Sequence, residues 1–546
     1  MKKILSLLAL VLIISCQEKE QNTADLIIKN AQIYTVNKDF STATAMAVKD
    51  GKVVFIGSQE DLKAQNLKAA KTIDASGKFI YPGLIDAHCH FYGLGQQLQR
   101  VDLVGTSSYD EVIQEVVNFQ EKNSKSFIIG RGWDQNDWDV KEFPTNEKLN
   151  ELFPDIPVAL TRIDGHAMIA NDAALKLAGI TVDTDPFGGA IEIKEGKLTG
   201  ILVDNPMELV EAVFPAETIK ESIKSLMDAQ EINFGYGITT VDDAGLMRST
   251  IELIDSLQQD GTLKMKIYAM ISNTPENLDY YLEKGIVKTN HLNVRSVKFY
   301  ADGALGSRGA AMKESYSDKH DHYGALLSSV KDFRGIAERI AATDYQMNTH
   351  AIGDSANYVV LKNYKELLSD KKDRRWRVEH AQIVDPADFE FFDTENILPS
   401  VQPTHATSDM YWAQDRVGEE RIQGAYAYKK LLGMSNMLAL GTDYPVEQVN
   451  PFLTFYAAVA RKDTSGFPEN GFCADQALSR EEALRGMTIW AAYSNFEENE
   501  KGSLEIGKAA DFIMLDQDLM EVAIEQVPNL KVSATYSNGE LVYSSK

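Results

Sequence analysis

The chain has 546 residues, of which 44% are hydrophobic and 25% charged, and its formal net charge is −25. This length suits a large barrel with additions, or two to three domains, and the composition is that of a globular protein able to bury a large core. The acidic balance and the lack of a Lys/Arg run argue against a nucleic-acid-binding protein.

The first residues have the features of an export signal. Lys2 and Lys3 precede an apolar run that is too short to span a bilayer in the ordinary way. The run ends in Leu-Ile-Ile-Ser-Cys, which resembles a bacterial lipobox, and this implies a lipid on the cysteine. We therefore expect a signal peptide over 1–15, a lipidated Cys16, a tether over 16–24, and a lipid-anchored location in the cell envelope, periplasmic or at the cell surface. A plain signal peptide or an uncleaved anchor is the alternative.

Both ends of the remaining chain consist of short alternating runs with turn signals. Asp50-Gly51 and Asn538-Gly539 are each flanked by apolar residues, as in β-hairpins. We expect residues 25–80 and 500–546 to form one composite β-sandwich domain. Only Cys89 and Cys473 lie beyond the signal, far apart in the chain, so no disulfide framework is expected.

Eight apolar or β-rich runs follow one another between these ends, separated mostly by helical patterns. Eight such units predict an α/β fold, a (β/α)8 TIM barrel over residues 81–499. The gap after the first run is too long for one crossover helix, so residues of about 91–224 are predicted to be an insertion with strands of its own. The runs are Leu84–Ala87, Gly237–Val241, Lys264–Met270, Val294–Tyr300, Tyr345–Thr349, Trp376–Glu379, Ile397–Gln402 and Met437–Leu440.

Residue types that can bind a metal, or can become able to, stand at the ends of these runs. Function in such barrels sits at the carboxyl ends of the strands. In an extended chain residues i and i+2 point to the same side, so His88 and His90 can share one cation while Cys89 points away. The other candidates, each from a different run, are Lys298, His350, His380 and Asp443.

Each candidate also has a structural interpretation when it is taken alone. A lone histidine at a strand end is more often structural, Asp443 could be a turn residue, and Lys298 could reach solvent. Cys89 is expected to be a small packed apolar residue. The coincidence of four histidines, a lysine and an aspartate with strand ends favours a metal site over these separate interpretations.

Several motifs resemble the amidohydrolase superfamily, and in particular its family 3 branch, over nearly the whole mature chain. They are Pro82-Gly-Leu-Ile-Asp-Ala-His-Cys-His, Val297-Lys-Phe-Tyr-Ala-Asp-Gly-Ala-Leu-Gly-Ser-Arg-Gly-Ala, Thr349-His-Ala-Ile-Gly-Asp, Glu379-His-Ala-Gln, Val401-Gln-Pro-Thr-His and Gly441-Thr-Asp-Tyr-Pro-Val. That branch includes N-substituted formamide deformylases and YtcJ-like proteins. The resemblance implies zinc, one or two ions per chain: His88 and His90 bind one ion, and His350 and His380 a second. It further implies that carboxylated Lys298 bridges them and that Asp443 binds metal and acts as the catalytic base.

Other residues near the strand ends are candidates for substrate binding. His405 follows the seventh strand, and Asp302 and Arg308 lie in the glycine-rich stretch after the fourth. His166 and Trp133 come from the insertion. A structural role is the alternative for each, and for Arg308 the alternative is a surface or structural ion pair.

The function expected first is metal-dependent hydrolysis of carbon–nitrogen bonds outside peptides, in N-acyl or N-formyl amides. A second hypothesis is deamination of a ring or cleavage of a cyclic amide by the same superfamily chemistry. A lipid-anchored binding protein without catalysis is a third, although no expected ligand is missing. The partners expected are a small-molecule amide and, through the anchor, a membrane; the sequence leaves a homodimer open.

Overall fold

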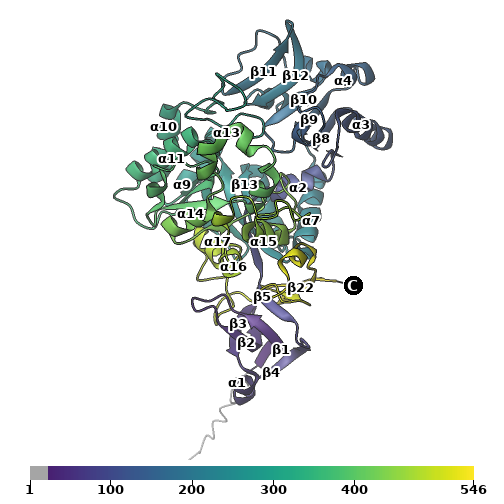
Figure 1. Ribbon diagram of the computed structural model, residues 1–546. Coiled ribbons are helices and arrows are strands. Elements are labelled where there is room, and N and C mark those ends of the chain that lie inside the picture. The colour runs from purple at the N-terminus through teal and green to yellow at the C-terminus, as the bar shows by residue number, and fades with distance from the viewer. Residues whose placement is uncertain (1–22, 546) are drawn as a thin grey trace, which may run out of the picture.

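Three β-sheets organise the protein, whose structure, a computed structural model, describes residues 23–545 (Figure 1). The central sheet forms a barrel, a second belongs to the segment after the first barrel strand, and a third joins both ends of the described chain. In Figure 1 the inserted sheet lies above the barrel and the terminal sheet below it. The barrel is therefore flanked on opposite sides.

The barrel contains all eight predicted strands, each parallel to its barrel neighbours, and the two-residue strand β15 (Val287–Lys288) pairs antiparallel with β16 at the side. Their apolar residues are buried, as expected of parallel strands covered by helices. The first and last strands are connected by backbone hydrogen bonds from Asp443 to His88 (2.7 Å) and from His90 to Tyr444 (2.8 Å), so the barrel is nearly closed. In sheet order the strands are β6 (Leu84–Cys89), β13 (Ile238–Leu246), β14 (Lys266–Ser272), β16 (Leu292–Tyr300), β17 (Gln346–Ala351), β18 (Trp376–His380), β19 (Ile397–Val401) and β20 (Ala439–Leu440).

Several of the helices that cover the barrel begin at a side-chain cap. Thr218 and Glu221 form a capping box at the start of α7, which buries Leu226 and Phe234 against the strands. The Ser329 side chain caps α10 by accepting a hydrogen bond from the backbone N–H of Asp332. The helices are α2 (Phe91–Gln97), α7 (Ile219–Gly235), α8 (Arg248–Gln259), α9 (Pro275–Lys284), α10 (Val330–Ala341), α11 (Asp354–Leu367), α12 (Pro403–Asp409), α13 (Ala413–Arg421), α14 (Tyr428–Ser435), α15 (Pro451–Ala460), α16 (Arg480–Gly486) and α17 (Ile489–Ser494).

The segment after β6 folds around its own six-stranded sheet and its own apolar cluster. The sheet order is β11-β12-β10-β9-β8-β7, and residues at the ends of β7, β9 and β12, on β8 and in the turn between β9 and β10 face the barrel mouth. Its elements are β7 (Val101–Asp102), α3 (Tyr109–Asn123), β8 (Ile128–Trp133), α4 (Glu147–Leu152), β9 (Val158–Arg162), β10 (Ala167–Ala170), α5 (Asp172–Leu177), β11 (Gly189–Lys194), β12 (Lys197–Asp204) and α6 (Met207–Glu211).

Strands from both ends of the described chain form one eight-stranded sheet rather than two separate ones. The long strand β1 pairs with β2, with β4 along its first part and with β5 near its end, so hydrogen bonding is continuous. The two predicted hairpin turns join β2 to β3 and β22 to β23. The elements are β1 (Thr23–Tyr34), β2 (Thr42–Lys49), β3 (Lys52–Gly57), α1 (Gln59–Ala64), β4 (Lys68–Asp74), β5 (Phe79–Pro82), β21 (Phe512–Leu515), β22 (Val532–Ser537) and β23 (Glu540–Ser544).

The predicted signal peptide and lipidated Cys16 lie outside the described residues. The tether was predicted over residues 16–24, but Thr23 and Ala24 already belong to β1. Among the described helices, none has the length and apolar character that crossing a bilayer requires.

Candidate metal centre

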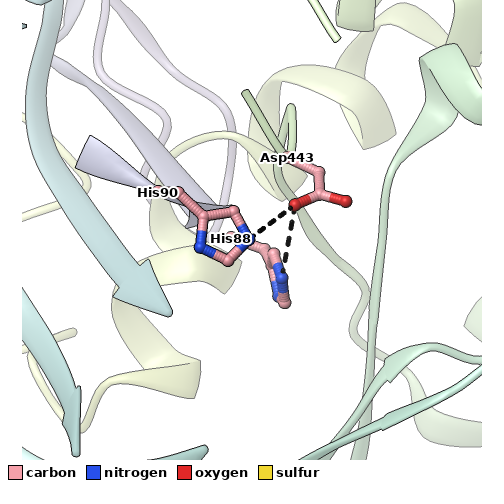
Figure 2. A group of neighbouring side chains, drawn as sticks. All are labelled: His88, His90 and Asp443. Atoms are coloured by element: carbon pink, nitrogen blue, oxygen red, sulfur yellow. Dashed lines mark ion pairs between the residues drawn. The ribbon is translucent and has the colours of Figure 1, made fainter. Parts of the chain in front are cut away.

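The two histidines at the end of β6 point toward the same carboxylate. The Nε2 atoms of His88 and His90 lie 3.6 and 3.2 Å from Oδ1 of Asp443. Dashed lines in Figure 2 mark these two pairs. Cys89 points the other way, and its Sγ lies 3.6 Å from the carbonyl oxygen of Asp242. The alternation of an extended strand therefore places one imidazole on either side of a buried cysteine and turns both to the barrel mouth.

Asp443 reaches the histidines because the loop after β20 runs directly against β6. A Cβ atom on Gly441 would come within 2.4 Å of the His88 backbone nitrogen, so only glycine fits there. Asp443 itself has a left-handed φ of 63°, and its backbone N–H donates to the carbonyl oxygen of His88. Its second carboxylate oxygen lies 3.5 Å from Nε2 of His405. One carboxylate thus faces three imidazoles.

The remaining predicted ligands come from β16, β17 and β18 and lie at the same mouth. Lys298 Nζ is 3.0 Å from Nε2 of His88. The ring centroids of His350 and His380 are 4.5 Å apart, and those of His88 and His380 are 5.0 Å apart. All six predicted ligands are therefore brought together, although they span most of the barrel sequence.

A buried ionic network holds His88 in one orientation. Glu379 Oε2 accepts a hydrogen bond from Nδ1 of His88 at 2.6 Å, and its other oxygen accepts one from Arg377 at 2.6 Å. Arg377 also donates to Asp242, which accepts a hydrogen bond from Asn495. Because an ionised carboxylate only accepts, the proton of His88 resides on Nδ1, and the Nε2 lone pair faces the barrel mouth.

Burial and neighbouring charges set the protonation of these groups. Desolvation, reinforced by Lys298, lowers the pKa of His88 to about 4, so the imidazole is neutral. Desolvation also lowers the pKa of Lys298 to about 8. Burial would raise the pKa of Asp443, but the neighbouring imidazoles hold it well below its usual range. The centre therefore offers the neutral imidazole of His88, an anionic carboxylate and a lysine that readily loses its proton.

The chemistry of these side chains fits a divalent metal ion. Two sets of three donor atoms lie within 4.8 Å of one another: His88, His90 and Asp443, and His380, His405 and Asp443. Nδ1 of His380, Nε2 of His405 and Oδ1 of Asp443 are buried with no hydrogen-bond partner. Buried polar atoms are rarely left in this condition, and imidazole and carboxylate are the ligands that zinc binds.

A cavity of about 1130 Å³ opens above the centre, and the insertion forms part of its wall. His166, on the turn between β9 and β10, lines the cavity with its ring centroid 5.0 Å from that of His350. Its Nδ1 is 2.7 Å from Asp204, whose carboxylate lies so close to Gly303 and Gly309 that a Cβ on either would clash with it. The glycines after β16 thus admit the aspartate that orients His166 over the centre.

Three of the predicted substrate residues do not line the cavity. Trp133 is 1% exposed within the apolar cluster of the insertion, and its indole N–H donates to Leu160. Arg308 pairs with Asp318 at 2.9 Å, which is the ion-pair alternative. Asp302 is fully buried and accepts backbone hydrogen bonds after β17, 3.7 Å from His350. Trp133 and Arg308 therefore belong to the surrounding framework, and Asp302 supports the loop beside His350.

The residues that sequence reasoning missed are those of the buried network behind the histidines. Glu379 stands directly before His380 in a quoted motif, yet its partner His88 is 291 positions away. Arg377 precedes it by two residues, the spacing that places both side chains on the same side of the strand. That spacing was the sequence signal that could have predicted an Arg377–Glu379 pair beside the histidines.

Residues 71–543 match the sequence profile of the amidohydrolase family. The chain is 33% identical to Protein LONG AFTER FAR-RED 3 of Arabidopsis thaliana, over 95% of this chain and 92% of that one. It is 30% identical to the putative amidohydrolase YtcJ of Bacillus subtilis (94% and 98%) and 26% identical to an N-substituted formamide deformylase of Arthrobacter pascens (95% and 98%). A crystal structure of a metal-dependent hydrolase from Pyrococcus horikoshii superposes with a TM-score of 0.74 at 29% identity, covering 92% of this chain and 99% of that one. The chain belongs to the amidohydrolase family, as a metal-dependent hydrolase.

Proposed function

We propose that the protein is a zinc amidase that hydrolyses N-acyl or N-formyl amides of small molecules, with one or two ions per chain. The observation that carries the proposal is the convergence of three imidazoles on the single carboxylate of Asp443 inside a large cavity. The name of the Arthrobacter relative, a formamide deformylase, supports the choice of bond.

His88, His90, His350, His380 and Asp443 would hold the metal. Lys298 would join them as a carbamate, because its lowered pKa makes the neutral amine accessible and its Nζ already lies beside His88. Zinc, when bound, supplies a Lewis acid and acidifies a water molecule to a pKa of about 7.

The protein's own residues supply the proton transfers and the substrate contacts. Asp443 takes the proton of the attacking water and passes it to the leaving nitrogen, since an amine leaves poorly unless it is protonated. His405 and His166 both line the cavity. Against the effect of burial, the hydrogen bond of Nδ1 with Asp204 raises the pKa of His166, which favours the imidazolium form, and its Nε2–H would then donate to the substrate carbonyl oxygen.

A panel of N-formyl and N-acyl amines, incubated with the zinc-loaded protein, tests the proposal. Release of amine from at least one compound, abolished by a chelator and restored by zinc, is expected. A zinc-loaded, folded protein that leaves every amide intact while deaminating a ring or opening a cyclic amide would contradict it.

The proposed location also has a direct test. Lipidation of Cys16 would anchor the enzyme in the cell envelope, where it would meet small molecules before uptake. A fatty-acid analogue should label the wild-type protein and not Cys16→Ser; equal labelling of both would exclude Cys16 as the lipidated residue.

A further inference from the structure

Three arginines lie in the wall of the cavity, and they differ in what neutralises them. Arg162 forms ion pairs with Asp134 and with Asp164, the latter at 2.5 Å. Arg100 lies 3.6 Å from Glu217. Arg131 has no carboxylate oxygen within 4.0 Å among the residues described. The cavity therefore contains one guanidinium without a paired acid.

Arg131 is held in place by backbone rather than by charge. It lies on β8, and its Nη2 donates to the carbonyl oxygen of Ile163 at 2.8 Å. A Cβ on Gly165 would lie 3.2 Å from the same nitrogen, so the guanidinium packs closely against the turn between β9 and β10. Its Nε is buried without a partner, and its Nη1 makes no hydrogen bond within residues 23–545. The guanidinium of Arg131 is therefore fixed in position, while its Nε and Nη1 remain free to donate hydrogen bonds.

Two neighbouring acids already have other hydrogen-bond partners. Asp102 is the register neighbour of Arg131 on β7, but its Oδ1 accepts from the backbone N–H of Val104. Asp164 is paired with Arg162. Burial lowers the pKa of Arg131, and the charge of Asp443, across the same cavity, opposes this effect. Arg131 and the metal centre thus face one space and interact electrostatically.

A buried guanidinium without a paired anion is unfavourable, and a carboxylate is the group whose geometry matches its fork of donors. We infer that Arg131 is the anchor for a carboxylate of the substrate, so the enzyme acts on amides that carry an acid, such as N-acyl amino acids. This inference rests on the proposed amidase function. The anchor would hold the acid end while the amide carbonyl lies at the centre.

The experiment compares each substrate as a free acid and as its carboxamide, using the N-formyl and N-acetyl derivatives of alanine and phenylalanine. The wild-type zinc enzyme should prefer the acids in kcat/KM by about tenfold to a hundredfold, the scale of a charge-assisted hydrogen-bond pair. Arg131→Met should lose this preference through KM, with the carboxamides hydrolysed within about threefold of wild type, and Arg131→Lys should restore part of it.

A matched control removes the same charge elsewhere. Arg308→Met breaks an ion pair outside the cavity and is expected to keep the preference for acids. Thermal melts of the variants establish that each is folded. A preference that survives in folded Arg131→Met, or one that Arg308→Met loses equally, would overturn the inference.

A binding measurement separates this inference from the proposed function. N-acetylalanine and N-acetylalaninamide are titrated calorimetrically onto the zinc-loaded protein and onto Arg131→Met. If the wild-type protein binds the acid more tightly than the carboxamide and Arg131→Met does not, the anchor is supported even if no amide is hydrolysed. A lack of hydrolysis would contradict only the proposed amidase function. Equal binding of acid and carboxamide by wild type overturns the anchor, whatever the protein hydrolyses.

Discussion

The buried carboxylate behind His88 gives the sharpest single perturbation, Glu379→Gln. Both Glu379 and Arg377 are fully buried, and the two oxygens of Glu379 accept one hydrogen bond each from His88 and Arg377 at 2.6 Å. A glutamine amide offers one acceptor oxygen for these two donors. If its NH2 group faces His88, the imidazole proton moves to Nε2 and blocks the lone pair that would bind metal.

The expected loss of metal affinity in Glu379→Gln follows from the loss of the hydrogen bond that orients His88. Loss of such an outer partner typically weakens metal binding about tenfold to a hundredfold, which is about 1.4 to 2.7 kcal/mol. The fold should lose about 3 kcal/mol, the lower end of the cost of breaking a buried ion pair, because Arg377 keeps Asp242 and the carbonyl of Ala87.

Competition with a chromophoric zinc chelator measures the metal affinity, and urea unfolding measures stability. Glu252→Gln is the matched control, since it makes the same chemical change in an exposed ion pair with Arg248. Zinc affinity of Glu379→Gln within threefold of wild type, in a folded protein, would refute the orienting role of Glu379.

Three further predictions concern the centre and its cavity. Asp443→Asn should keep the fold and lose turnover by at least about a hundredfold, measured as amine release; near wild-type turnover would remove Asp443 from the role of base. Bicarbonate should increase zinc uptake by the wild-type protein, and Lys298→Met should abolish that increase; an increase that persists in Lys298→Met would exclude the carbamate. Asp409 lines the cavity, and burial raises its pKa from 3.8 to about 7. The folded state therefore retains a proton that the unfolded chain releases, and stability falls as pH rises through that range. Urea unfolding at both ends of the range should show Asp409→Asn gaining stability over wild type toward the upper end, and no change in their difference would contradict this.

The barrel could be predicted from the sequence because each of its strands is a short, buried apolar run that the hydrophobic pattern marks clearly. The same logic located the metal-binding residue types, since parallel strands end at one mouth whatever lies between them. Strand alternation alone predicted that the side chains of His88 and His90 point to the same side.

Other features depend on which distant residues meet, and no local pattern encodes that. Asp242 and Asn495, which complete the network behind His88, are 253 positions apart. Trp133 lies two residues beyond Arg131 on β8, yet one is packed in the apolar cluster and the other lines the cavity. The strands from both ends are joined in one hydrogen-bonded sheet because β1 is long enough to pair with β2, β4 and β5, a length that its sequence does not mark.

Anomalous diffraction at the zinc edge from crystals of the zinc-loaded protein tests the central claim most directly. The account predicts a peak at about 2.0 to 2.2 Å from an imidazole nitrogen of His88, one of His90 and an oxygen of Asp443. Zinc bound at full occupancy elsewhere, with these three side chains left uncoordinated, would contradict it.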